Sequence, residues 1–386
     1  MTIHPSRDEF ASITESTPLV DELHARIARH GPITFREFMD AALYHPRYGY
    51  YMAGAEVTTR AGDYVTSPEV HPVFGTLVAK QIIELWRALD RPATFTVVEA
   101  GAGRGALARD VLVRAAREPD FGDALRYRIW ERSPRAQATQ HETLSEAAMD
   151  HYVEWSADSP RDIVGCILTN ELIDAFPVHR LFRSADGLRE VYVASDGRGF
   201  RDQFGPLSDP RLTGYFDALG LVPGMDCYAE ANLDAPAWIA EVARSLRRGY
   251  VLTFDYGYEA VALYAPWRRD GTLLCFYRQS VSSDPYQRIG KQDMTASVDF
   301  TTLRMAGETA GLRTVGMTDQ AAFLVGLGIA EGVAAIANDR SPQIEEYFAR
   351  RNVVLDLIDP AKLGRIKVLL QGKDAPEAAF TGLTDA

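Results

Sequence analysis

The chain has 386 residues, of which 46% are hydrophobic, and its formal net charge is −12. This length supports one large domain or two ordinary ones, and the negative charge argues against a nucleic-acid partner. The three cysteines are widely spaced and the eight histidines lack ligand spacing, so neither disulfides nor a metal site is predicted. The most apolar stretch, 322–337, is too short for a membrane span, and the N-terminus does not resemble a signal or transit peptide. We expect a soluble, cytoplasmic protein with no membrane partner.

The N-terminal part of the chain predicts helices. Apolar residues recur at helical spacing over 17–40 and 69–90. Between these stretches lies an aromatic and glycine-rich segment with turn chemistry, and its paired tyrosines (YGYY) are expected in a core or a cleft wall.

Alternating strands and helices are predicted from residue 94 onward. Apolar strands are expected at 94–100, 127–130, 151–155 and 162–169, with a helix at 105–117. This alternation predicts a parallel sheet with helices on its faces.

The later elements follow the same logic. Strands are expected at 250–257, 271–277 and 363–370, and the tail from 328 is expected to be mostly helical. The intervening residues 184–248 predict an insertion that contains a hairpin at 189–200 and a helix at 235–248.

A glycine-rich turn directly follows the first of these strands. Gly101, Gly103 and Gly105 allow a sharp turn and close approach of a ligand. A dinucleotide pattern is formally satisfied, but the ribose-binding acid expected about 20 residues later falls in a loop, and the acid that ends the second strand is Glu131. Glu99 completes E-x-G-x-G-x-G, which is typical of S-adenosylmethionine (SAM) sites, so we favour SAM over NAD. A turn that only serves helix packing is the remaining alternative.

With these residues, the chain resembles the MidA-like family of class I SAM-dependent methyltransferases, which are relatives of the mitochondrial complex I assembly-factor arginine methyltransferase. The resemblance is carried by LYHPRYGYY, GDYVTSPEVHPVFG, VVEAGAGRG, NELIDAFPVHR, LTFDYG, GTLLCFY, QDMTASVDF and LGRIKVLL, which span nearly the whole chain.

The resemblance implies an α/β, Rossmann-like methyltransferase fold with a mostly parallel seven-stranded sheet and helices on both faces. Residues 1–92 are expected to form a helical cover and cofactor lid, and residues 93–386 the core. Insertions at about 184–248 and 258–300 are expected to cap the substrate. The family includes dimers, so a homodimer is a further expectation.

The resemblance also implies which residues bind SAM. They are Thr66, Ser67, Pro68, Glu99, Gly101, Gly103, Gly105, Glu131, Asp158 and Asn170. Glu131 is expected to bind the ribose hydroxyls, and Asp158 the adenine amino group. Read from the residues alone, Asp158 is also compatible with a turn cap, Glu131 with a surface ion pair, and residues 66–68 with a helix start.

The candidate catalytic residues are carboxylates that follow the fourth and fifth core strands. Glu171 and Asp174 share a face if the segment turns helically, and two carboxylates can hold a guanidinium and manage its proton. The predicted catalytic residues are Glu171, Asp174 and Asp255, and the predicted substrate-binding residues are Tyr256, Asp293 and Thr295. Asp174 is equally compatible with a helix start, and Asp255 with a turn cap.

Two departures from the family pattern bear on the substrate. Gln279 and Ser297 stand where histidines are expected, which removes two proton acceptors. The leading hypothesis is methylation of a protein arginine. The alternatives are a small-molecule O- or N-methyltransferase, a non-catalytic assembly factor with a retained SAM site, and an NAD-linked oxidoreductase.

Overall fold

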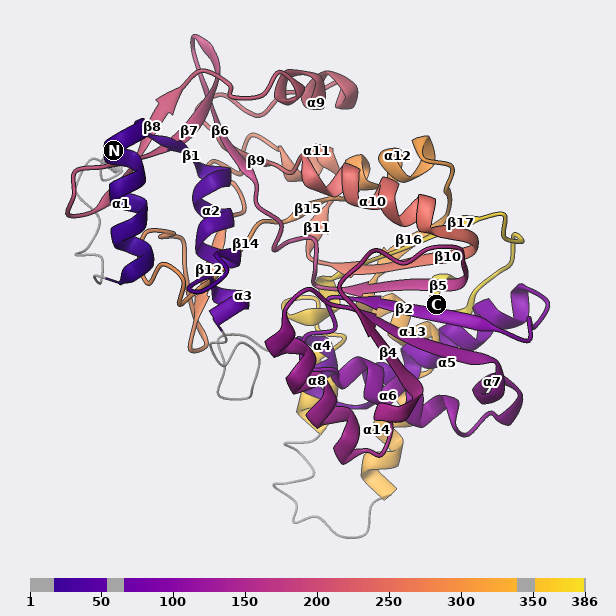
Figure 1. Ribbon diagram of the computed structural model, residues 1–386. Helices are drawn as coiled ribbons and strands as arrows, with labels where there is room; N and C mark the ends of the chain where they lie inside the picture. Colours follow the sequence, from indigo (N-terminus) through magenta and orange to yellow (C-terminus); the bar gives the residue numbers. More distant parts are fainter. Residues whose placement is uncertain (1–16, 54–65, 339–350, 385–386) are drawn as a thin grey trace.

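The computed structural model describes residues 17–53, 66–338 and 351–384, which form two lobes side by side (Figure 1). The larger lobe is built on a seven-stranded sheet, and the smaller lobe contains a five-stranded sheet. Among the residues described, no helix is long and apolar enough to cross a membrane.

The large sheet has the strand order β16, β17, β10, β5, β2, β3, β4. Its strands are β2 (Phe95–Ala100), β3 (Leu125–Trp130), β4 (Val153–Ser156), β5 (Ile163–Asn170), β10 (Leu246–Asp255), β16 (Arg313–Asp319) and β17 (Lys367–Lys373). The five strands from β10 to β4 are parallel, whereas β17 runs antiparallel to both of its neighbours. The predicted mostly parallel seven-stranded sheet is confirmed.

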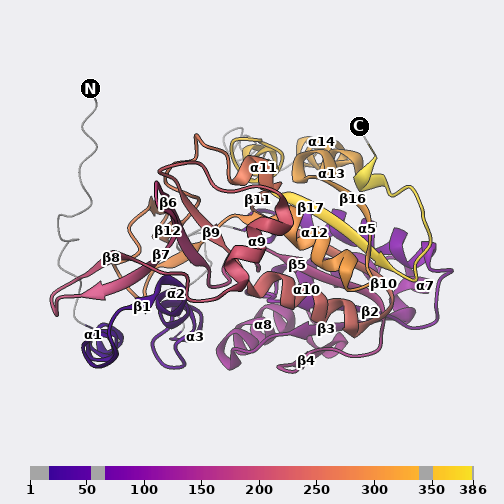
Figure 2. The same ribbon diagram turned by 90° about the horizontal axis from the view of Figure 1, so that it is seen from above.

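Helices cover both faces of the large sheet, as predicted. On one face, α5 (Val73–Ala88), α6 (Ala106–Ala115) and α8 (Pro134–Glu146) share a core with Val97. On the other face, α10 (Asp234–Ser245) and α12 (Phe300–Thr309) share a core with Val98. Neighbouring residues of β2 therefore enter opposite cores, which explains its continuous apolar run. The first set lies below the sheet in Figure 1, and Figure 2 shows α10 and α12 from above.

One edge of the large sheet differs from the sequence-based expectation. The strand predicted at 271–277 is β12 (Leu274–Tyr277), but it pairs with β13 (Ser280–Ser282) and β14 (Asp293–Thr295) in a separate small sheet. The edge strand is instead β16, for which no strand was predicted. The residues of β16 are mostly half-buried on both faces. Apolar and polar residues therefore do not alternate clearly along this strand.

The smaller lobe combines the N-terminal helices with inserted strands. Its elements are α1 (Pro18–His30), β1 (Ile33–Thr34), α2 (Phe35–Tyr44), α3 (Tyr50–Ala53), β6 (His179–Ser184), β7 (Gly187–Ser195), β8 (Phe200–Gly205), α9 (Arg211–Leu219) and β9 (Tyr228–Ala231). The predicted hairpin at 189–200 is present as β7 and β8. The helical stretch predicted over 17–40 is divided, because Gly31, at φ +85°, ends α1 and Thr34 caps α2 in a capping box with Glu37.

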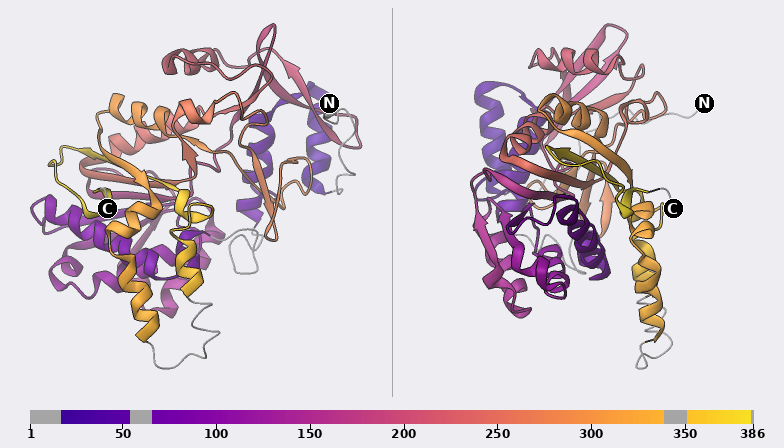
Figure 3. Two further views of the ribbon diagram at one scale, coloured as in Figure 1. Left: turned by 180° about the vertical axis from the view of Figure 1, so that it is seen from behind. Right: turned by 90° about the vertical axis from the view of Figure 1, so that its right-hand side faces the viewer.

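The N-terminal helices and the inserted strands have one hydrophobic core in common. Phe35 and Phe38 of α2 pack in the same cluster as Val193 of β7, Phe200 of β8 and Met294 of β14. Figures 1 and 3 show α1 and α2 beside these strands from the front and from behind. By contrast α5, from the same predicted cover, packs on the large sheet. The domain boundary at residue 92 stays a prediction.

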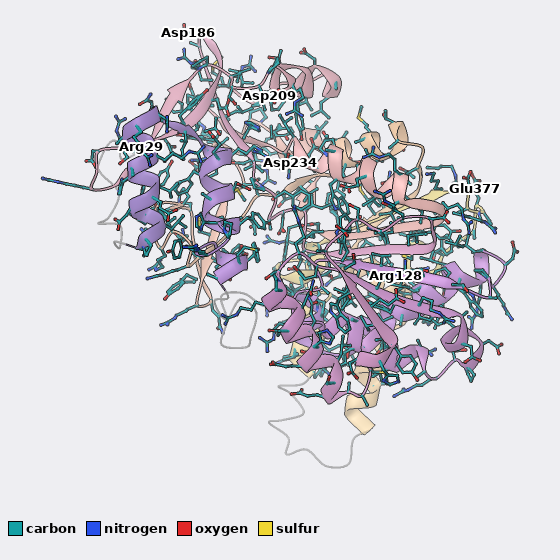
Figure 4. The ribbon with its side chains drawn as sticks, viewed as in Figure 1. Arg29, Arg128, Asp186, Asp209, Asp234 and Glu377 are labelled. Carbon is teal, nitrogen blue, oxygen red and sulfur yellow. The ribbon has the colours of Figure 1, made fainter. Side chains whose placement is uncertain are left out.

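The remaining elements are short or lie near the sheet edges. They are α4 (Ser67–Val70), α7 (Pro119–Ala124), β11 (Gly257–Tyr258), α11 (Ala260–Leu263), β15 (Val298–Asp299), α13 (Gln320–Gly326) and α14 (Ile329–Asn338), with 3-10 turns at Asp150–Tyr152, Leu363–Arg365 and Thr381–Leu383. An ion pair between Arg36 of α2 and Asp234 at the start of α10 joins the lobes at 2.6 Å, and Figure 4 labels Asp234 between them.

Candidate active site

The carboxyl ends of the parallel strands form the candidate site. In open α/β sheets, ligands bind outside this edge where the strand order reverses. Here the reversal falls between β2 and β5, because β3 and β4 extend the sheet to one side of β2 whereas β5 and β10 extend it to the other. Most of the predicted site residues lie in the loops that follow these strands.

The glycine turn after β2 has left-handed backbone at all three glycines. The φ angles are +68° at Gly101, +53° at Gly103 and +86° at Gly105. A Cβ at Gly101 would lie 2.7 Å from Leu172, whereas a Cβ at Gly103 would meet no atom of the described residues within 4 Å. The turn therefore packs against the loop after β5 on one side and leaves open space at Gly103.

Two acids flank the glycine turn, of which Glu99 is buried and Glu131 is half-buried. Glu99 accepts a hydrogen bond from the Tyr127 hydroxyl at 2.6 Å, and burial raises its pKa to about 7 although this bond opposes the shift. Glu131 follows β3, and its Oε1 accepts from the Ser133 amide at 2.8 Å. Burial raises the pKa of Glu131 as well. The surface ion pair was only the alternative for Glu131, and in the structure its carboxylate bonds Ser133 and the buried side chain of Gln140 instead.

Asp158 lies in an exposed turn after β4. Its amide donates to Ser156 Oγ at 3.0 Å, so a local turn is present, but the side chain that caps it is that of Ser156 and not of Asp158. Asp158 also lines a groove of about 330 Å³ together with Trp130 and Ser156. A cofactor contact of Asp158 and its role in this turn are therefore compatible.

The N-terminal segment 66–68 meets the end of β5. Thr66 is the N-cap of α4, and Pro68 lies in its first turn, so the predicted helix start is present. The Ser67 amide donates to Glu171 Oε1 at 3.2 Å, and Asn170 Nδ2 donates to the same oxygen at 2.9 Å. Glu171 Oε2 is buried and has no hydrogen-bond partner among the residues described. Burial raises the pKa of Glu171 to about 8.

Asp255, at the end of β10, holds the turn that carries these acids. Its Oδ2 accepts from the Leu172 amide at 3.2 Å and from the Ile173 amide at 2.8 Å, and its Oδ1 accepts from the Tyr256 amide at 2.8 Å. Burial raises the pKa of Asp255 to about 7, and these bonds oppose the shift. The contacts give Asp255 a positioning role, and its predicted part in catalysis stays a prediction.

Asp174 lies on the same turn and is buried among other acids. Burial raises its pKa well above the usual value. Three neighbouring carboxylates raise it further, and they are those of Asp255, Glu171 and Asp293. A cluster of four buried carboxylates therefore forms beside the glycine turn, and a bound cation would be stabilised there.

Tyrosines of the smaller lobe reach this acidic cluster. The Tyr51 hydroxyl donates to Asp293 Oδ1 at 2.7 Å, and the Tyr44 hydroxyl donates to the Ala175 carbonyl at 3.0 Å. The two rings stack with centroids 5.5 Å apart. Thr295 follows two residues after Asp293 on β14 and so faces the same side. The YGYY segment predicted a wall for a cleft, but nothing in its spacing indicated these acidic partners.

The two positions that depart from the family pattern are in different surroundings. Gln279 lies at the exposed tip of the hairpin between β12 and β13, with φ +63°. The Ser297 amide donates to Thr272 Oγ1 at 3.1 Å, which fixes the link between β14 and β15. Among the residues described, no three His, Cys, Asp or Glu side chains are grouped to hold a metal ion.

A family model of S-adenosyl-L-methionine-dependent methyltransferases matches residues 77–318, which include the large sheet up to β16. The chain belongs to this family. The assignment confirms a SAM-dependent methyltransferase with a Rossmann-like fold.

Similar proteins support the same assignment along nearly the full length. The methyltransferase is 31% identical to the Drosophila melanogaster protein named protein arginine methyltransferase NDUFAF7 homolog, mitochondrial, with 91% of this chain and 84% of that protein covered. It is 27% identical to the Homo sapiens protein named protein arginine methyltransferase NDUFAF7, mitochondrial, with 90% and 81% covered. A Burkholderia thailandensis protein bound to S-adenosyl-homocysteine superposes with a TM-score of 0.86 at 30% identity, over 96% of this chain and 97% of that one.

The residues of the methyltransferase fit this cofactor. A ligand such as SAM can come close to the backbone where no Cβ stands in the way, and Gly103 leaves that space open. It also carries positive charge, and three acids lie near the turn: Glu99 and Glu171, which are buried, and Glu131, which is half-buried. SAM rather than NAD is thus confirmed as the cofactor, while the contact assigned to each residue stays a prediction.

Proposed function

We propose that this methyltransferase acts on the arginine side chain of a protein. The convergence of Glu171, Asp174 and Asp293 beside Asp255 carries the proposal. An arginine guanidinium is a permanent cation whose planar N–H groups match carboxylates. The names of the curated relatives support the same acceptor class.

The cofactor is held by the loops after β2, β3, β4 and β5. When bound, SAM supplies an electrophilic methyl group on a sulfonium. Glu131 accepts from the ribose hydroxyls, Asp158 accepts from the adenine amino group, and the open side of Gly103 admits the methionine part. The other proposed contacts are Thr66, Ser67, Pro68, Glu99, Gly101, Gly105 and Asn170.

The acidic cluster orients the acceptor and takes its proton. Glu171 Oε2, which no described residue bonds, accepts an N–H of the guanidinium, and Asp174 accepts a second. The proton released as the nitrogen is substituted passes to Glu171, whose pKa of about 8 suits a base near neutral pH. Asp255 keeps both acids in place, and Asp293, Thr295 and Tyr256 line the acceptor site. In-line transfer depends mainly on such positioning.

A labelling experiment tests the acceptor class. The protein is incubated with methyl-labelled SAM and extract from the source cells, and protein is separated from small molecules. We expect label in the protein fraction and, by mass spectrometry, methylated arginine. Glu171→Gln should abolish the label, whereas Glu377→Gln, which changes an exposed carboxylate in the C-terminal segment, should not.

Label confined to the low-molecular-weight fraction would overturn the proposal and favour the small-molecule alternative. The curated relatives are named as mitochondrial proteins, so their names lend no support to the predicted cytoplasmic location, which stays a prediction, as does the homodimer. The absence of nucleic-acid and membrane partners likewise stays a prediction.

A further inference from the structure

We infer that Gln140 is a positioning residue that fixes Glu131 and the glycine turn for SAM; the inference rests on the cofactor placement proposed above. Gln140 lies on α8 and its side chain is completely buried, with 0% exposure. A buried amide is costly unless its donors and acceptor are bonded. Its partners therefore indicate what the side chain does.

The amide of Gln140 bonds segments from three neighbouring strands. Its Nε2 donates to the Gly103 carbonyl at 3.0 Å and to Glu131 Oε2 at 3.3 Å. Its Oε1 accepts from Trp155 Nε1 at 3.1 Å. Gly103 follows β2, Glu131 follows β3, and Trp155 lies in β4. One side chain thus ties together the three strand ends along which the cofactor is placed.

Trp155 determines which way the Gln140 amide points. An indole nitrogen only donates, so the amide oxygen must face Trp155 and both N–H groups must face the acceptors. The His141 ring stacks on the Trp155 ring, with centroids 3.7 Å apart, and this stacking holds the indole in place. The packing of α8 on β4 therefore fixes the orientation of the Gln140 amide.

Both oxygens of Glu131 are held as a result. Ser133 bonds Oε1 and Gln140 bonds Oε2, which leaves one lone pair of each oxygen for a ligand hydroxyl. The Gln140 bond also favours the charged carboxylate, against the effect of burial. A pre-oriented, charged Glu131 binds a ribose diol without first ordering its own side chain.

Calorimetric titration with S-adenosylhomocysteine (SAH) tests this role. Gln140→Met keeps the volume and removes both N–H donors, and we expect roughly tenfold weaker binding or more. Gln81→Met is the matched control, because Gln81 is a buried glutamine on α5 that bonds the Gly382 amide in the C-terminal segment. It should leave the SAH affinity unchanged. Melting temperatures without ligand report the folding cost of each variant.

A double-mutant cycle with Glu131→Gln separates positioning from a general structural effect. Once Glu131 is changed, Gln140→Met should weaken SAH binding by less than it does in the wild type, and the loss that remains reports the bond to the Gly103 carbonyl. Gln140→Glu, which preserves the shape but places a second carboxylate against Glu131, is the second variant and should also bind weakly.

Wild-type affinity in Gln140→Met, or its full effect persisting in the Glu131→Gln background, would overturn the inference. No SAH binding by the wild type would overturn the cofactor placement as well. Failure to label arginine while the cycle behaves as expected would count only against the proposed acceptor.

Discussion

Gly103→Val tests whether the open side of the glycine turn is where the cofactor lies. Gly103 has φ +53°, and a Cβ there would meet no atom within 4 Å. The substitution therefore strains the backbone by about 1–2 kcal/mol, and its Cβ meets none of the described residues. If SAM fills this space, the valine methyls overlap it, at a cost of about 1–3 kcal/mol, or roughly 5- to 150-fold in affinity.

Gly220→Val is the matched control for this strain. Gly220 ends α9 with φ +62°, and a Cβ there would also meet nothing within 4 Å. Both variants should lose similar stability in thermal unfolding, but only Gly103→Val should weaken SAH binding in calorimetry. Equal SAH affinity of Gly103→Val and wild type would refute the placement of the cofactor at this turn.

Four further predictions concern the acidic cluster. Because burial raises the pKa of Glu171 from 4.5 to about 8, the folded state binds its proton more tightly, so stability without ligand should fall as pH rises from about 4.5 to 8. Glu171→Gln should flatten part of this slope in melting curves, and an unchanged slope would contradict the shift. In the same range, kcat/KM of the wild type should rise with pH through about 8 if Glu171 is the base, as proposed. Asp255→Asn should lower the free energy of unfolding by about 1–3 kcal/mol, measured with denaturant, because buried amides of the turn lose a charged acceptor; a neutral effect would argue against its positioning role. Tyr51→Phe should raise KM for the acceptor while leaving the Kd for SAH unchanged, because it removes a hydrogen bond to Asp293, which is proposed to line the acceptor site. A change confined to SAH binding would refute this assignment of Tyr51 to the acceptor site.

Local sequence signals were sufficient for the central strands and the glycine turn. Phe95–Ala100 is buried throughout and mostly apolar because both faces of β2 are covered, and the glycines after it adopt left-handed backbone. Such features depend on neighbours in the chain. Glu131 and Glu171 were found for the same reason, since each directly follows a core strand.

Features that depend on distant partners were not predictable in this way. The segment 271–277 has the apolar pattern of a core strand, yet its pairing with β14 places it in another sheet. Gln140 looks like a surface residue of a polar helix, because only Leu144 is buried with it there. Its role emerges from Gly103, Glu131 and Trp155, which lie on three other segments.

The core that joins the N-terminal helices to the inserted strands also constrains how the chain folds during synthesis. Ile33 of β1 pairs with Val193 of β7, about 160 residues later in the chain. At roughly 5–20 residues per second, a ribosome needs on the order of 10–30 s to supply that partner. Throughout this interval the side chains of Phe35 and Phe38 have no inserted strand to pack against. The first helices to be made must therefore wait for the smaller lobe to be completed, while β2, β3 and β4 can already begin to assemble.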